Sequence, residues 1–380
     1  AVSFNSFSQN AIFGDDFANG WSNSQTESIC FEEGVGTSRI KTLQPNGSSG
    51  NKFFRLVTCW DNNFNEWGPN TANDLVVSIG SEVTDVNENS TNKAYKIESA
   101  DVSNNYIFKT REGGNPPSNP AFVVFEVQGD VRIINSVSQN ITGDVFFGDE
   151  ITVTATLDNN LNSGQAVYLR YTDDNFGSST IVNMTGSGTS YTANIPASFN
   201  TAGKNVDYYV FTSGTDSSNN PLTISGSDAD FNTINLDNNS GSNYSYNVRS
   251  EYITESGATN WNDSSSWRAS AVPSGTDDVI IDHDLTLTDD RTINSITINN
   301  GNTLTNNGNT LSIQNTGSIT NNGSYSDSSG TVEFLGTASV NGTISFNNVI
   351  LNNDGVNFGS NSTINGNLTI NSGGFVNTGS

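Results

Sequence analysis

The chain has 380 residues, of which 39 are acidic and only 14 are basic, giving a formal net charge of −25. Nucleic-acid binding depends on clustered Lys and Arg, whereas the basic residues here are scattered singly, so nucleic acid is not expected as a partner. No apolar run approaches the roughly 20 residues that a membrane-spanning helix needs, so the chain is not expected to span a membrane.

Asparagine and glycine dominate the composition. The sequence contains 59 Asn and 36 Gly, the residue types that best tolerate positive φ in tight turns. So polar a chain could instead be disordered, but its 21 Phe, 11 Tyr and 5 Trp lie in alternating runs and are sufficient for packed cores. Helical periodicity is almost absent. We therefore predict an all-β protein with many turns.

Residues 1–130, the first block, form the first of three predicted domains. Short apolar runs occur at 52–60, 74–79, 94–97, 105–109 and 122–127, and turn-rich connections separate them. This pattern predicts a β-sandwich.

Residues 131–250, the second block, are predicted to form an immunoglobulin-like or fibronectin-like β-sandwich. Strands are expected at 131–134, 151–157, 166–171, 191–195, 206–211 and 244–248. The alternation of Ile151, Val153, Ala155 and Leu157 with threonine predicts an inward apolar face and an outward threonine face.

Residues 251–380, the third block, repeat a short motif. It consists of three or four alternating apolar and polar residues followed by Asn and Gly. The motif occurs at 295–301, 304–308, 319–323 and 368–374. One such unit cannot bury a core, but coils stacked on each other can, which predicts a β-solenoid. Trp261 and Trp267 precede the repeats and are expected to cap the open end of the stack.

Parts of the second and third blocks resemble modules of large secreted surface proteins of Bacteroidetes. The similar stretches are 167–172, 184–188, 208–214, 243–248, 261–281, 345–353 and 364–370. Such proteins are typically exported by the type IX secretion route, so the resemblance implies an extracellular or bacterial cell-surface location. Their sorting domain is not found here and the sequence stops within the predicted solenoid, so we expect a processed chain or part of a longer one. The first block is loosely similar to carbohydrate-binding sandwiches.

The two cysteines, Cys30 and Cys59, are expected to form a disulfide if the protein is extracellular. Closing their roughly 30-residue loop would add on the order of 3 kcal/mol of stability. Two buried free thiols are the alternative.

Calcium is the one metal for which the sequence offers candidate ligands. Asp61, Asn63, Asn65 and Glu66 place oxygen atoms in a loop that resembles the start of an EF-hand. The glycine required at the sixth position is missing, and Ala72 stands where the bidentate Glu would be. A plain turn is the competing interpretation.

Trp67 is the candidate for carbohydrate binding, with Asn63 and Asn65 as partners for sugar hydroxyls. An indole face can stack on a pyranose ring, although Trp is first of all a core residue. Trp60 follows an alternating strand and is expected in the core.

His283, the only histidine, could act as a general base beside Asp282 and Asp284. Alternation along 279–287 instead places His283 on the inward face of one strand, with both aspartates outward. We therefore interpret it as a structural residue and predict no enzymatic activity.

These observations together predict a non-enzymatic extracellular protein with a structural or adhesive role. Self-association or contact with neighbouring surface proteins is expected, and glycans are candidate ligands. An uncapped solenoid end, completed by residues 1–7 of another copy, would give a head-to-tail filament. The alternatives are a carbohydrate-binding accessory protein and the ancillary part of a larger secreted enzyme.

Overall fold

The structure is a computed structural model that describes residues 9–14, 17, 31–59, 66–88, 93–111, 121–352, 355–359, 361–371 and 376–378. The chain is all-β, as predicted. Among the described residues the one α-helix, α1 (Ala229–Asn232), has four residues. No helix in these ranges is long and apolar enough to cross a membrane.

The described residues of the first block form two sheets that share one core. One has the strand order β6-β8-β4-β5-β7, with β1 paired to β4, and the other has the order β10-β9-β3-β2. Aromatic rings from both sheets meet between them: the centroids of Phe54 and Phe108 lie 5.1 Å apart, and those of Tyr95 and Phe122 lie 4.8 Å apart. The strand bounds are β1 Gln9–Phe13, β2 Glu32–Glu33, β3 Arg39–Leu43, β4 Gly50–Cys59, β5 Glu66–Gly68, β6 Leu75–Val76, β7 Asn87–Glu88, β8 Tyr95–Ala100, β9 Asn105–Thr110 and β10 Phe122–Val127.

The second block also contains two sheets, with strand orders β11-β13-β17-β16 and β12-β20-β18-β14-β15, and β19 pairs with β18. Burial alternates along β13 from Ile151 to Leu157, which confirms the predicted inward face of that strand. The bounds are β11 Ile134–Gln139, β12 Val145–Phe146, β13 Ile151–Leu157, β14 Gln165–Thr172, β15 Thr180–Asn183, β16 Thr185–Ser187, β17 Ser190–Ile195, β18 Asn205–Gly214, β19 Asn235–Asp237 and β20 Tyr244–Arg249.

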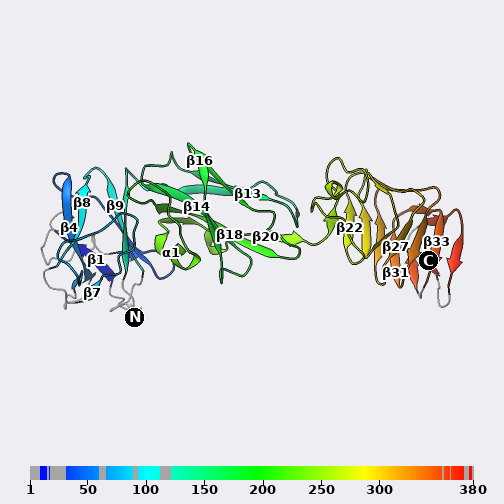
Figure 1. Ribbon diagram of the computed structural model, residues 1–380, viewed down its shortest axis with the longest axis horizontal. Coiled ribbons are helices and arrows are strands. Elements are labelled where there is room, and N and C mark those ends of the chain that lie inside the picture. Colours follow the sequence, from blue (N-terminus) through cyan, green and yellow to red (C-terminus); the bar gives the residue numbers. More distant parts are fainter. Residues whose placement is uncertain are drawn as a thin grey trace, which may run out of the picture. The chain divides into compact units, whose positions relative to one another are not determined.

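The third block is a β-solenoid, as predicted (Figure 1). Its described strands form five coils of three strands each, stacked in parallel, with β21 (Tyr252–Ile253) before them and β37 (Val376–Thr378) after them. The coils are β22 Asp278–Ile281, β23 Leu285–Leu287 and β24 Arg291–Ile293; β25 Ser295–Ile298, β26 Thr303–Asn306 and β27 Thr310–Ile313; β28 Ser318–Asn321, β29 Ser324–Asp327 and β30 Thr331–Phe334; β31 Ala338–Asn341, β32 Ile344–Phe346 and β33 Asn348–Leu351; β34 Val356–Phe358, β35 Ser362–Ile364 and β36 Leu368–Ile370.

Equivalent apolar side chains stack from coil to coil in the solenoid core. Val279 pairs with Ile296, Ile296 with Ile319, and Ile319 with Val340. All four side chains are at most 1% exposed. Parallel in-register pairing of this kind lets each short strand complete the core of its neighbours.

Asparagine side chains at the corners bond neighbouring coils to each other. The Nδ2 of Asn299 donates to Asp282 Oδ1 at 2.8 Å, and that of Asn309 donates to the main-chain oxygen of Leu287 at 2.9 Å. Asn321 donates to the main-chain oxygen of Thr343 at 2.7 Å. These bonds satisfy polar groups that the turns leave outside the strand ladders, which gives the high asparagine content a structural reason.

The predicted tryptophan cap is present at the start of the solenoid. Trp261 and Trp267 are 0% and 1% exposed and belong to the solenoid core. Their ring centroids lie 4.9 Å apart, and the indole N–H of Trp267 donates to the main-chain oxygen of Trp261 at 2.9 Å.

The chain divides into two compact units. One unit comprises Ala1–Asn140, Thr152–Asn194 and Val206–Ser245, and the other comprises Ile141–Ile151, Ile195–Asn205 and Tyr246–Ser380. The junction between the first and second blocks therefore lies inside the first unit. The junction between the second block and the solenoid lies inside the second unit.

Candidate functional site

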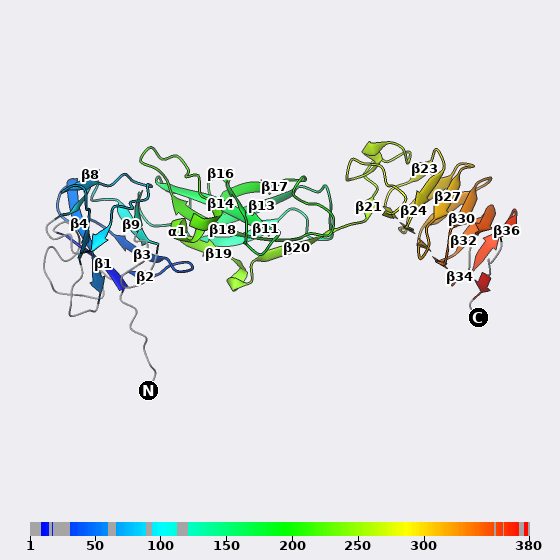
Figure 2. The same cartoon turned by 60° about the horizontal axis from the view of Figure 1, so that its bottom comes forward.

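A group of buried and half-buried charged side chains surrounds a segment of the second block that packs on the first block. We call residues 222–236, between β18 and β20, the wedge segment. It includes α1, which lies beside β9 in both views of the fold (Figures 1 and 2).

The wedge segment completes two apolar clusters. On one side its Phe231, 4% exposed, packs with Ile107 of β9 and Phe125 of β10. On the other side its Ile224 packs with Phe211 of β18. Both faces of β9 and β10 are consequently buried, one by the core of the first block and the other by the wedge segment.

Lys109 is the central polar residue beneath the wedge segment. Strand alternation directs it to the same face of β9 as Ile107, opposite Phe108. It is 0% exposed, and its Nζ donates to the main-chain oxygen of Asp230 at 2.9 Å and to that of Thr233. Burial lowers the pKa of Lys109 to about 7, partly offset by the Asp230 carboxylate.

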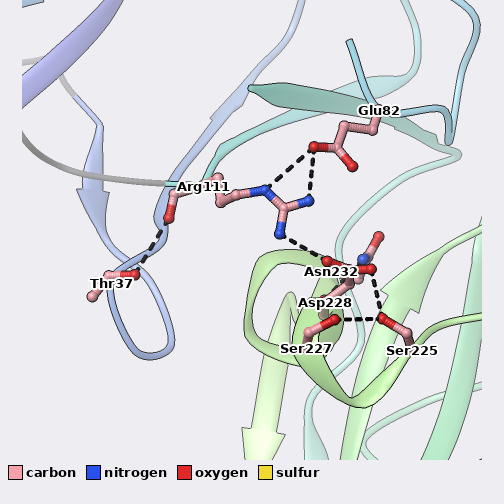
Figure 3. Close-up of polar contacts among 7 residues, drawn as sticks. All are labelled: Thr37, Glu82, Arg111, Ser225, Ser227, Asp228 and Asn232. Atoms are coloured by element: carbon pink, nitrogen blue, oxygen red, sulfur yellow. Dashed lines mark hydrogen bonds and ion pairs between the residues drawn. The ribbon is translucent and has the colours of Figure 1, made fainter. Parts of the chain in front are cut away.

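Arg111 lies at the rim of the same contact (Figure 3). Its guanidinium donates to Glu82 Oε1 of the first block and to Asp228 Oδ1 of the wedge segment, both at 2.7 Å. It also lies over the ring of Phe231, 4.6 Å from the centroid. The hydroxyl of Ser225, followed by Arg111, lowers the pKa of Asp228, so the carboxylate is held in its charged form.

Arg170 of β14 anchors the wedge segment from the second block. Its Nη1 donates to the Tyr209 hydroxyl at 2.6 Å and lies 3.9 Å from the Asp230 carboxylate. Its guanidinium lies 4.9 Å from the centre of the Phe176 ring. Phe176 has a φ of +64°, a conformation that is unfavourable for an aromatic residue unless its surroundings hold it.

The chemistry of this cluster is that of a structural contact. A lysine whose pKa is lowered toward neutrality could serve as a nucleophile or base. Lys109, however, is fully buried and its ammonium or amine group already donates to two carbonyl oxygens. A solute cannot reach it without displacing the wedge segment.

A second contact of mixed aromatic and charged side chains joins the tip of the second block to the solenoid cap. The rings of Phe147 and Tyr252 meet edge to face at 4.8 Å, and Tyr252 meets Trp267 at 6.3 Å. Arg268 lies 3.5 Å from the buried carboxylate of Asp149. These contacts hold Phe147 and Asp149 of the second block against the solenoid cap.

Trp67, the predicted sugar-stacking residue, lies in β5 and belongs to the core of the first block. It is only 3% exposed. A sugar ring needs an accessible indole face, so this burial argues against the predicted binding role. Its predicted partners Asn63 and Asn65 lie outside the described residues.

The predicted calcium ligands Asp61, Asn63 and Asn65 lie outside the described residues, as does the side chain of Glu66. In the part of the chain that the structure does describe, no three His, Cys, Asp or Glu side chains are grouped as a metal site requires. The predicted disulfide also lies outside the description, because Cys30 and the Cys59 side chain are not part of it.

His283 corrects one detail of the strand prediction. Residues 279–287 form not one strand but two, β22 and β23, and His283 lies in the corner between them. It is partly buried, and its Nδ1 lies 3.2 Å from the main-chain oxygen of Thr254. Alternation does not continue through a corner, so the predicted position of His283 on the inward face of one continuous strand is wrong.

The contact at the wedge segment was not predicted, although one sequence signal was present. Phe122 to Val127 contain five apolar residues and one Glu, and so continuous a run is typical of a strand buried on both faces. It did not reveal which segment covers the second face.

No protein-family model, no curated protein and no solved structure matches this chain.

Proposed function

We propose that this protein is a non-enzymatic extracellular protein with a structural or adhesive role, displayed at or released from a bacterial surface. The observation that carries the proposal is that buried and half-buried charged side chains bond separate segments of the fold to each other. Lys109, Arg111 and Arg170 each bond segments that are far apart in the sequence. Their hydrogen bonds stabilise the fold.

The architecture of the solenoid supports the same role. Its coils are joined both by apolar stacking and by asparagine side chains that cross from coil to coil. A stack of this kind gains length by adding coils and presents regular side surfaces. Those properties suit a stalk or adhesin.

We further propose that the two sheets of the first block and the two of the second are β-sandwiches, the second immunoglobulin-like or fibronectin-like. The shared core of the first pair and the alternating burial of β13 support this classification. Export by the type IX route rests on the sequence resemblance.

We propose more specifically that the protein self-associates. Leu368 and Ile370 of β36 are 44% and 50% exposed, whereas equivalent residues in earlier coils are buried. A second copy of this chain would cover them, with residues 1–7, which lie outside the description, as the donated strand. Sedimentation of full-length protein over a wide concentration range, compared with a variant lacking residues 1–8, tests this form. A full-length protein that stays monomeric at high concentration contradicts it.

The role itself is tested with purified full-length protein on polysaccharides and on bacterial and host surfaces. We expect surface attachment or assembly visible by negative-stain microscopy, and no substrate turnover. Turnover that one Asp or Glu substitution abolishes would overturn the proposal. Binding to a soluble glycan without assembly would favour a carbohydrate-binding accessory protein.

A further inference from the structure

The sequence contains seven Asn–Gly pairs, six of them in the described residues: at 46–47, 300–301, 307–308, 322–323, 341–342 and 365–366. In such a pair the main-chain nitrogen of Gly can attack the side-chain carbonyl carbon of Asn, because Gly has no Cβ to obstruct the approach. The attack requires that this peptide group rotate and that its nitrogen be free of other partners.

Hydrogen bonds hold several of these peptide groups in place. The N–H of Gly308 donates to the main-chain oxygen of Asn306 at 2.9 Å, and that of Gly366 donates to the oxygen of Asn347 at 2.7 Å. At 46–47 the main-chain oxygen of Asn46 accepts from Lys52 Nζ at 2.7 Å.

Crowding restricts two further pairs. A Cβ on Gly323 would lie 2.3 Å from the main-chain oxygen of Asn299, and one on Gly342 would lie 2.0 Å from that of Asn321. The backbone at both glycines is thus pressed against the preceding coil.

The peptide between Asn300 and Gly301 has neither restraint. Within the described part of the chain, its C=O and N–H and the Asn300 side chain make no hydrogen bond. Both residues are exposed, and a Cβ on Gly301 would meet nothing within 4 Å. Gly301 has a φ of +87° and follows Asn300 in a turn closed by the bond from Asn302 N to Asn299 O.

We propose that Asn300 is a site of spontaneous deamidation. The Gly301 nitrogen forms a bond to Cγ of Asn300 and loses its proton, and the bond from Cγ to the side-chain nitrogen breaks, releasing ammonia. Water then hydrolyses the cyclic imide to aspartate or isoaspartate. One negative charge is added, and the isoaspartate product also lengthens the main chain by one carbon.

The position gives the reaction a structural consequence. Asn300 follows Asn299, whose side chain bonds the second coil to Asp282 of the first. The main-chain N–H of Thr303, three residues later, donates to Asp284 at 2.7 Å. A lengthened main chain at 300 shifts both attachments, so aged protein should have a less firmly held first coil.

The test is peptide mapping by mass spectrometry after incubation of the full chain at mildly alkaline pH. We expect Asn300 to convert about tenfold faster than Asn307, the ratio that a hydrogen bond worth ~1.4 kcal/mol would produce. In strong denaturant the two rates should become similar. Equal rates in the native protein overturn the proposal, and so does a rate ratio that persists in denaturant.

Two matched variants give a second readout in the intact protein. Asn300→Gln slows ring closure because the ring that forms is larger, and it should remove most of the acidic species that accumulate on isoelectric focusing. Asn307→Gln should leave their accumulation unchanged. The opposite result contradicts the assignment.

Discussion

The Nζ of Lys109 donates a hydrogen bond of 2.9 Å to the main-chain oxygen of Asp230, a residue 121 positions later in the chain. This bond joins β9 of the first block to the wedge segment of the second, beneath the apolar contact of Phe231. A buried amine with two carbonyl partners makes the contact both specific in geometry and sensitive to protonation.

Replacing Lys109 with Met should remove part of the pH dependence of stability. The folded-state pKa of Lys109 is about 7, below its ordinary value of 10.5, so above pH 7 the unfolded chain binds a proton that the folded chain does not. The free energy of unfolding of the native protein, relative to Lys109→Met, should therefore rise from pH 7 toward pH 10. Below pH 7 the cost of burying the charge is fully present.

Urea titrations at several pH values measure this difference. Both proteins share the buried tyrosines, whose raised pKa values act at higher pH, so their effect cancels in the comparison. Lys96→Met, which removes a lysine paired with Glu98 at 2.8 Å, serves as the control and should keep the native slope. A Lys109→Met protein with the native slope would show that the amine is not held as described.

The pair of Arg111 and Asp228 should contribute only modestly to stability. The two side chains are 23% and 34% exposed and lie 2.7 Å apart, so solvent screens their attraction. A double-mutant cycle with Arg111→Ala and Asp228→Asn should give a coupling energy of about 1 kcal/mol or less, reduced by added salt. Arg111→Ala alone should cost more, because it also removes the contact with Phe231. A coupling energy of several kcal/mol would contradict the assigned exposure.

Gly317→Ala should strongly destabilise the solenoid. The added Cβ would lie 1.9 Å from the main-chain oxygen of Asn294 in the preceding coil, so the backbone must shift at a cost of about 1–3 kcal/mol or more. Gly275→Ala is the matched control, because its nearest atoms would be 3.6 Å away or farther. Its stability should change by less than about 0.5 kcal/mol. Thermal unfolding followed by circular dichroism measures the destabilisation in both variants. Equal destabilisation by Gly317→Ala and Gly275→Ala would contradict the described packing of the coils.

The solenoid could be predicted well because the sequence pattern that specifies it lies within short, neighbouring stretches of the chain. The repeated runs ending in Asn and Gly set both the strand length and the position of each turn, and the stacked column of Ile296 and Ile319 follows from the repeat. The corner at His283 was missed because alternation alone cannot show where a strand ends.

The wedge segment could not be predicted from local pattern. Residues 222–236 carry apolar side chains at irregular spacing, and their partners Ile107 and Phe125 lie about a hundred residues earlier. Only the tertiary fold shows that such a segment covers a second sheet face. Trp67 illustrates the same limit, since the sequence made it the candidate for sugar stacking whereas the fold buries it.

Hydrogen exchange in the full-length Phe231→Ala variant tests most directly the claim that the wedge segment joins the first and second blocks into one structural unit. The substitution removes the side chain that packs on Ile107 and Phe125, at an expected cost of about 3–5 kcal/mol. Exchange should accelerate together in β9 and β10 of the first block and in β14 and β18 of the second, and it should stay unchanged in β25 to β30 of the solenoid. Acceleration confined to the wedge segment, with the strands of both blocks as protected as in the native protein, would contradict the account.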